Sequence, residues 1–230
     1  MSQGARRVRV DMHTHSEYSP DSRTPLRVQA EAIRAAKLDI VCATDHNTIE
    51  GALHLREMAD AFRVIVGEEV STRDGEIIGL FLDRPIPRDL PAEETIARIK
   101  DQGGIVCVPH PFSRNRRFHL RREALDRLWP QIDCLEVFNA RESFSADNRR
   151  AAAYAKDHGI PGAVGSDAHR ASEIGRAWVE VTDFTGPQEM VEALRTGSVS
   201  GRLTGTAIHL ATRYDVMRKW WTRRRTRRKT

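Results

Sequence analysis

The sequence is poor in cysteine and has no long hydrophobic segment. Its three cysteines, Cys42, Cys107 and Cys134, are an odd number, and each lies within an apolar run. We therefore expect reduced packing residues in a cytoplasmic protein, not a disulfide framework. No run of about 18 apolar residues is present, which argues against a membrane-spanning helix. Residues 1–7 lack an apolar segment and do not predict a signal peptide.

Acidic residues are absent from residues 218–230, which contain eight lysines and arginines. Since the chain has 37 basic and 32 acidic residues in all, the remainder carries 29 basic residues against 32 acidic ones, a net charge of −3. The positive charge therefore belongs to a tail. This tail is either a disordered solubilising extension, an arm for nucleic acid on which Trp220 and Trp221 stack against bases, or a segment that docks on an anionic membrane surface.

The length and the 40% hydrophobic content favour one domain. We expect an N-terminal extension at residues 1–7, a folded domain at 8–210 and the basic tail at 211–230. Strand-like and helix-like segments alternate through the domain, with a hairpin or an added strand at 76–82. The expected strands are 8–12, 39–43, 63–66, 105–108, 133–138, 160–164 and 177–181, and the expected helices are 25–37, 49–60, 92–102, 123–129, 146–158 and 187–195. Such repeats within one domain favour a parallel sheet or a β/α barrel.

Histidines and carboxylates follow five of these strands. They are His13 and His15, Asp45 and His46, Glu68 and Glu69, His110, and Asp167 and His169. Alone, His-x-His is weak evidence for a metal site and more often marks two surface histidines beside a turn. In β/α barrels, however, the carboxyl ends of the strands meet at one rim, so these side chains are expected to converge. Imidazole and carboxylate groups together are typical ligands of divalent metals.

The motifs resemble, in order and spacing, those of the PHP family, the polymerase-and-histidinol-phosphatase metal-dependent phosphoesterases. They are His-Thr-His with Ser-Pro-Asp, Thr-Asp-His-Asn, Gly-Glu-Glu, Pro-His-Pro, Glu-Val-Phe-Asn-Ala-Arg and Gly-Ser-Asp-Ala-His, within residues 8–182. The resemblance implies an α/β fold, a distorted (β/α)7 TIM-like barrel in a single domain. It also implies two or three divalent metal ions (Mn, Fe or Zn) and hydrolysis of phosphate esters.

The resemblance also implies a set of ligands. The matching positions are His13, His15, Asp21, His46, Glu69, His110, Asp167 and His169. Glu69 is the residue expected to bridge two metals. Asn139 stands where some relatives have a His or Cys ligand, which leaves the third metal open.

Other residues are assigned roles in the chemistry. We place Asp45 with Glu69 and His169 in the catalytic set, Asp45 as a group that orients a ligand or handles a proton. A helix N-cap is an equal alternative for Asp45. Arg141 and Arg114 follow strand ends and are candidate phosphate-binding residues, since arginine binds phosphate bidentately; the alternative is solvated surface charge.

The expected function is hydrolysis of a nucleotide or another small phosphorylated metabolite, in which clustered metals lower the pKa of bound water and stabilise the leaving oxygen. A nuclease or oligonucleotide phosphatase that uses the basic tail is the alternative enzyme. Two further alternatives are a non-catalytic metal-holding barrel with a docking tail and an amidohydrolase-type barrel that cleaves C–N bonds. The latter typically has a metal-bridging lysine, and no motif here places a lysine at a strand end.

Overall fold

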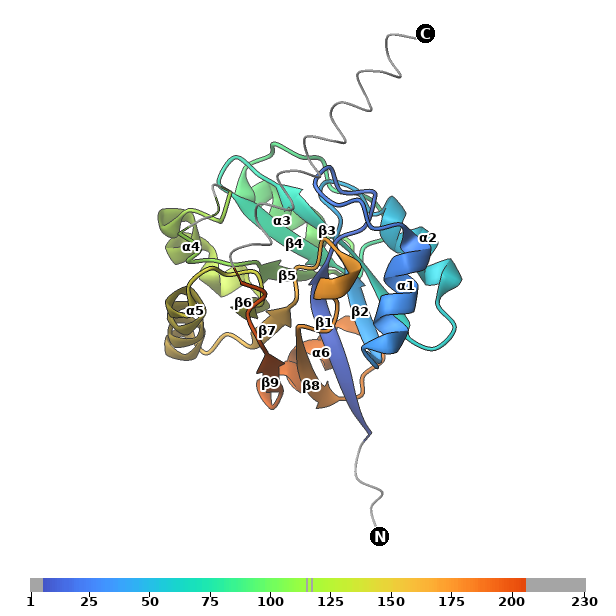
Figure 1. Ribbon diagram of the computed structural model, residues 1–230. Coiled ribbons are helices and arrows are strands. Elements are labelled where there is room, and N and C mark those ends of the chain that lie inside the picture. The colour runs from blue at the N-terminus through green and yellow to red at the C-terminus, as the bar shows by residue number, and fades with distance from the viewer. Residues whose placement is uncertain (1–5, 115, 117, 206–230) are drawn as a thin grey trace, which may run out of the picture.

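The computed structural model describes residues 6–114, 116 and 118–205, which form one α/β domain. Nine strands and six α-helices build a nearly closed barrel in this part of the chain (Figure 1). In chain order they are β1 (Arg7–Thr14), α1 (Leu26–Ala35), β2 (Ile40–Ala43), α2 (Glu50–Met58), β3 (Arg63–Ser71), β4 (Glu76–Leu80), α3 (Ala92–Lys100), β5 (Ile105–Val108), α4 (Arg122–Leu128), β6 (Cys134–Asn139), α5 (Ser145–His158), β7 (Gly162–Gly165), β8 (Ala177–Thr182), α6 (Pro187–Arg195) and β9 (Ser198–Gly201). The predicted fold class is confirmed.

The sheet has the strand order β7-β6-β5-β4-β3-β2-β1-β8-β9. Six strands run parallel, in the two groups β1–β2–β3 and β5–β6–β7, and antiparallel β4 joins the groups. The barrel closes at its rim, where Thr14 at the end of β1 bridges Ala168 beyond β7. The His15 N–H donates to the Ala168 carbonyl at 2.9 Å, and the Asp167 N–H donates to the His13 carbonyl at 2.7 Å.

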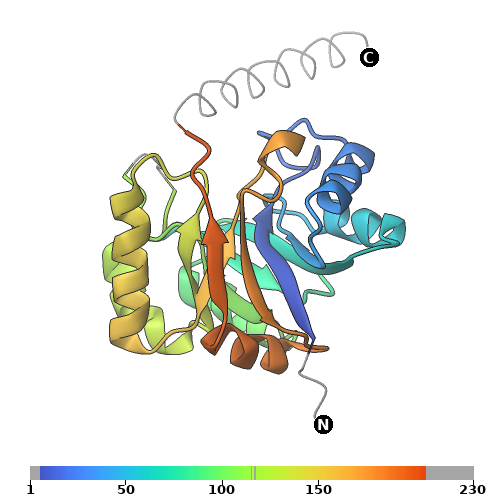
Figure 2. The ribbon, with the colours of Figure 1, turned by 60° about the horizontal axis from the view of Figure 1, so that its bottom comes forward.

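The helices cover the outside of the barrel. Helices α1 and α2 lie on one side and α4 and α5 on the opposite side, while α6 lies at the end where β1 begins (Figures 1 and 2). One core cluster, which includes Ile33, Leu55 and Ile99, fills the space between helices and sheet. A second cluster, which includes Val10 and Cys42, fills the barrel interior. The outer helices therefore fix the strands, and the strand ends fix the rim.

The structure confirms the predicted helices to within a few residues and corrects three strands. The predicted strand 63–66 is longer, because β4 pairs with residues 67–71, so Glu69 lies inside β3 and does not follow it. The predicted strand 177–181 is present as β8, but it runs antiparallel to β1. Strand β9, a short and largely exposed sequence, was not predicted.

The cysteines and the hydrophobicity of the helices bear on two further expectations. Cys42, Cys107 and Cys134 are all free and buried, as predicted. None of the helices in the described residues is long and apolar enough to cross a membrane. The expected domain limits and the role of the tail stay predictions, since residues 206–230 lie outside the described residues.

Candidate metal centre

Four predicted ligands from three strands converge at the rim. The Nε2 atoms of His13 and His15 lie 3.0 Å apart, and each is 3.3 Å from Glu69 Oε2. Asp167 Oδ1 lies 3.8 Å from His13 Nε2 and 3.5 Å from His15 Nε2. Atoms that each lie about 2.1 Å from one tetrahedral cation are about 3.4 Å from one another. The spacing of His13, His15 and Asp167 therefore fits one shared ion, and Glu69 lies beside it, in contact with both histidines.

Local backbone structure aims these side chains at one point. Alternation along β1 puts His13 and His15 on one side, while the Thr14 hydroxyl points toward β2 and donates to the Cys42 carbonyl at 2.9 Å. His110 and Asp167 have positive φ values of 31° and 53°. Non-glycine residues rarely adopt this conformation, and it is concentrated at functional sites.

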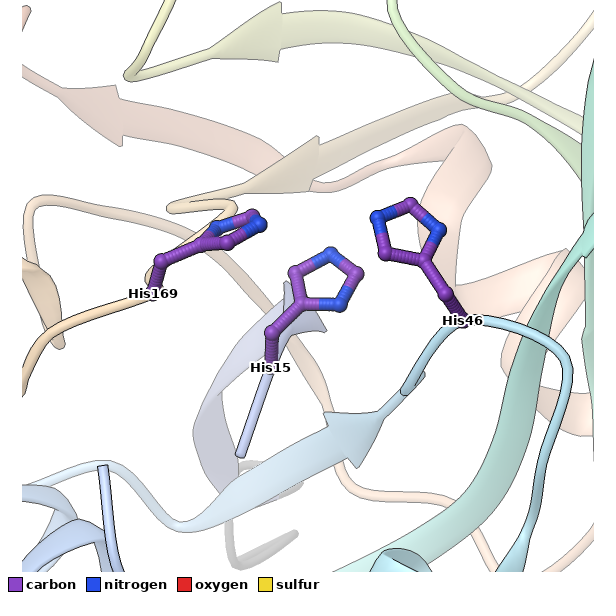
Figure 3. Close-up of side chains that lie close together, drawn as sticks. All are labelled: His15, His46 and His169. Atoms are coloured by element: carbon purple, nitrogen blue, oxygen red, sulfur yellow. The ribbon is translucent and has the colours of Figure 1, made fainter. Parts of the chain in front are cut away.

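A second group consists of three imidazoles with one carboxylate. The rings of His15, His46 and His169 converge from three different strand ends (Figure 3), with ring centroids 4.6 Å apart for His15–His46 and 4.2 Å apart for His15–His169. Asp21 Oδ2 lies 2.8 Å from His169 Nε2 and 3.5 Å from His46 Nε2. His15 thus belongs to both groups.

A third group forms on the β4 side of Glu69. His110 Nε2 lies 3.0 Å from Glu69 Oε1 and 3.8 Å from Glu76 Oε2, and His46 Nδ1 lies 3.3 Å from Glu69 Oε2 and 3.8 Å from Glu76 Oε1. Burial and the Glu69 charge raise the pKa of Glu76 to about 8. Glu69 therefore contacts histidines of all three groups, and its role as a bridging ligand stays a prediction.

The chemistry of the donor set fits divalent cations. No described residue donates a hydrogen bond to Asp167 Oδ1 or Asp21 Oδ1, although both atoms are buried. Uncompensated buried carboxylate oxygens are costly unless a cation binds them. Burial lowers the pKa of His169 to about 4, so its ring is neutral at pH 7. Burial also lowers the pKa of His110.

Buried polar groups behind the ligands hold them in place. Glu136 Oε1 lies 3.1 Å from His13 Nδ1, and Glu136 Oε2 accepts hydrogen bonds from the His110 N–H at 2.8 Å and from Asn139 Nδ2 at 2.9 Å. Asn139 Nδ2 also donates to Asp167 Oδ2 at 3.0 Å. Asn139 therefore bridges two carboxylates at the position where some relatives have a metal ligand.

Asp45 faces the loop that follows β1. Its carboxylate accepts hydrogen bonds from the Ser16 N–H and the Ser16 hydroxyl, both at 2.6 Å, and from the Ser19 hydroxyl at 2.8 Å. The N-cap of α2 is Ile49, which has no side-chain cap. The alternative of an Asp45 N-cap is therefore wrong, and the ligand-orienting role matches these contacts.

The two predicted phosphate-binding arginines lie in different places. Arg141 is buried, with Nη1 against His169 Nδ1 and Nε 3.0 Å from Glu173 Oε1. Arg114 is half exposed, pairs with Asp147 at 2.9 Å and stacks 4.3 Å from the centre of the Phe144 ring. The guanidinium that instead reaches the cluster is that of Arg116, which contacts Asp167 Oδ2 and lies 3.4 Å from Asn139 Oδ1.

Sequence reasoning missed Glu76, Glu136 and the role of Arg116. Glu136 was visible as an acidic residue in the expected strand 133–138, and its burial inside an apolar run is the signal for a partner. Glu76 begins an expected added strand whose position relative to the rim could not be read from the sequence. Arg116 was one of several arginines in one loop, and only coordinates distinguish it from Arg114.

Comparisons with known proteins identify sequence relatives of this chain. Residues 11–128 match the family model of the PHP domain, and residues 145–199 match a model described as PHP-associated. Uncharacterised protein MJ0417 of Methanocaldococcus jannaschii is 32% identical over 199 residues, which are 82% of this chain and 79% of that protein.

Solved structures share the fold at low identity. A two-domain protein from Bacteroides vulgatus, which contains a predicted PHP-like metal-dependent phosphoesterase, has a TM-score of 0.72 at 18% identity; the match covers 87% of this chain and 66% of that one. An amidohydrolase from Chromobacterium violaceum has a TM-score of 0.61 at 16% identity, with 84% and 97% covered. At these identities the likeness concerns the fold alone.

Proposed function

Because the chain belongs to the PHP domain family, we propose that it is a metal-dependent phosphoesterase that hydrolyses a nucleotide or another small phosphorylated metabolite. The observation that carries this proposal is the convergence at the barrel rim, where the Nε2 atoms of His13 and His15 lie 3.0 Å from each other and 3.3 to 3.8 Å from carboxylate oxygens of Glu69 and Asp167. We propose two or three divalent ions (Mn, Fe or Zn), which would lower the pKa of water and offset phosphoryl charge.

Besides the proposed ions, two arginines beside Asp167 supply positive charge for binding a phosphate group. Arg116 and Arg141 approach this carboxylate from two loops, Arg116 at Oδ2 and Arg141 at 3.8 Å from Oδ1. Guanidinium groups bind phosphoryl oxygens bidentately, so we assign substrate phosphate to Arg116 and Arg141 ahead of Arg114. Glu173 holds Arg141 in place through its Nε and also accepts the His169 N–H at 3.1 Å.

A nuclease or oligonucleotide phosphatase is the second candidate function. It is favoured by where the described chain ends: the Thr204 N–H donates to the Ala140 carbonyl at 2.8 Å. The chain therefore leaves the barrel next to Arg141, at the same rim as the metal centre. We propose that residues 218–230, with eight basic residues, add affinity for the phosphates of a nucleic acid. Docking on an anionic membrane is the competing role for this segment.

Two other readings have less support. An amidohydrolase that uses a bridging lysine needs that lysine at the cluster. Between residues 6 and 205 the lysines are Lys37, Lys100 and Lys156, and none of them is among the contacts of the candidate ligands in the described chain. A non-catalytic barrel would leave the inward-facing arginines without a substrate.

Phosphate release tests the proposal. Purified full-length chain with Mn²⁺ is offered AMP, a nucleoside 3′,5′-bisphosphate and short RNA. Release from the small nucleotides that His13→Ala abolishes is the expected result. Preference for RNA that is lost on deletion of residues 218–230 would establish the nuclease instead. Binding of that segment to anionic vesicles, with RNA turnover unchanged by the deletion, would assign it to membranes. No release from any ester by Mn²⁺-loaded protein would refute both enzymes.

The arginine assignment has a matched pair of variants. Arg116→Ala is expected to raise KM about 10-fold or more, since a charge-assisted hydrogen bond contributes roughly 1.5–3 kcal/mol. Arg114→Ala, from the same loop, is expected to change KM less than about 2-fold, because exposed ion pairs such as Arg114–Asp147 contribute little. The reverse order would show that Arg114 is the phosphate-binding residue.

A further inference from the structure

A buried serine connects the loop after β1 to the two ligand groups that share His15. Ser19, Asp45 and His15 are each at most 1% exposed. The Ser19 hydroxyl lies 2.9 Å from His15 Nδ1 and 2.8 Å from Asp45 Oδ1, and the His46 N–H donates to it at 3.0 Å. One side chain thus contacts the ring of one candidate ligand and the backbone of another.

These three contacts fix which atom donates in each hydrogen bond. A serine hydroxyl has one proton and two lone pairs. The His46 N–H can only donate, and the Asp45 carboxylate, which already accepts from the Ser16 N–H and the Ser16 hydroxyl, can only accept. The Ser19 proton therefore goes to Asp45, and Ser19 accepts from His15. It follows that His15 carries its proton on Nδ1 and presents the lone pair of Nε2 to the cluster.

The consequence extends to both ligand groups. His15 is the one histidine that belongs to the group with His13 and Asp167 and also to the group with His46 and His169. His13, in contrast, belongs only to the first group and is oriented by Glu136, which contacts no other ring of the two groups; its remaining contacts within the described residues are the His110 N–H and the Asn139 amide. A substitution that misorients the His15 ring should therefore lower the ion affinity of both groups, and a substitution of Glu136 should lower mainly the ion affinity of the first group.

We propose that Ser19, oriented by Asp45, is the positioning residue that fixes the metal-binding tautomer of His15 and so couples the filling of two neighbouring ion sites. This inference rests on the metal binding in the proposed function but not on phosphate-ester hydrolysis. Orienting partners of metal ligands typically contribute 10- to 100-fold in metal affinity.

Titration of the full-length chain with Mn²⁺ alone tests the coupling. Ser19→Ala is expected to weaken binding of both ions roughly 10- to 100-fold. Glu136→Gln is expected to weaken one ion more than the other. Ser145→Ala, at an exposed serine on α5, is the control.

Unchanged Mn²⁺ affinity at both sites in folded Ser19→Ala would overturn the proposal, as would loss of only one ion. A second measurement does not depend on the variant folding. Nitrogen chemical shifts of ¹⁵N-labelled histidine in the ion-free wild-type chain at alkaline pH should identify His15 as the Nδ1–H tautomer. The Nε2–H tautomer would refute the inference. If Mn²⁺ binds as expected but no phosphate ester is hydrolysed, the proposed function fails and this inference stands.

Discussion

Replacing Gly165 with alanine tests how tightly the residues behind His13 are packed. Gly165 ends β7, and a Cβ atom there would lie 2.4 Å from both Glu136 Oε1 and His13 Cβ. Its φ is not in the left-handed region, so the backbone itself tolerates alanine. The methyl group must therefore displace either the β1 strand at His13 or the carboxylate that orients the His13 ring.

The expected cost follows from these contacts. An extra methyl group in a filled interior costs roughly 1–3 kcal/mol. Glu136 is the softer neighbour, but moving Oε1 breaks its 3.1 Å contact with His13 Nδ1, and a hydrogen bond to a charged group contributes about 1.5–3 kcal/mol. We expect Gly165→Ala to lower the free energy of unfolding by about 3–5 kcal/mol and Mn²⁺ affinity by about 10- to 100-fold.

Denaturant unfolding of the ion-free chain measures the first effect, and Mn²⁺ titration measures the second. The matched control is Gly162→Ala in the same strand. Its Cβ would lie 2.9 Å from a methyl group of Val137, a partly exposed side chain that can rotate away, so the cost should be about 1 kcal/mol or less. Equal stability and equal Mn²⁺ affinity in the two variants would show that His13 does not depend on close packing against Glu136.

Two further substitutions or conditions have clear expected outcomes. On helix propensity alone, Gly51→Ala should stabilise α2 by about 1 kcal/mol. Its Cβ, however, would lie 2.1 Å from Asp45 Oδ2 and 2.8 Å from Ser16 Oγ, so we expect a lower melting temperature and weaker Mn²⁺ binding. A higher melting temperature would contradict the Asp45 contacts. Mn²⁺ at 100 times its Kd should raise the free energy of unfolding by about 2.7 kcal/mol per site, and a chelator should reverse this increase. Denaturation curves that change with neither Mn²⁺ nor the chelator would argue against ion binding to the folded chain.

Much of the fold could be predicted from local pattern, because β/α units have short-range signals. Helix α5 shows this: it ends at Gly159, which adopts a left-handed φ of 66°. The extent of β3 could not be predicted, because residues 67–71 are in a strand only through their pairing with β4. The direction of β8 could not be predicted either, because an alternating apolar segment has the same pattern whether it pairs parallel or antiparallel to its neighbour.

The candidate site, like the fold, has residues that could be predicted from the local sequence and residues that could not. The positions of candidate ligands that follow strand ends, such as His110 and Asp167, could be predicted because barrel topology brings strand ends together. Residues that reach the cluster through tertiary structure were not. Glu76 depends on the insertion of β4 between β3 and β5, and Arg116 depends on the path of a loop. Sequence position alone favoured Arg114, whose guanidinium is instead held by Asp147.

The candidate metal centre lies at the seam where the barrel closes, and this explains why two distant segments of the chain supply its candidate ligands. His13 and His15 come from β1, and Asp167 comes from the end of β7. The same residues join the two strands: the Asp167 N–H donates to the His13 carbonyl, and Asp11 Oδ1 accepts the Ser166 N–H at 2.9 Å and the His13 N–H at 3.3 Å. Drawing the ligands around an ion therefore also draws the seam together. Because ligand binding to the folded state alone stabilises it, barrel closure and ion binding should reinforce each other at this seam.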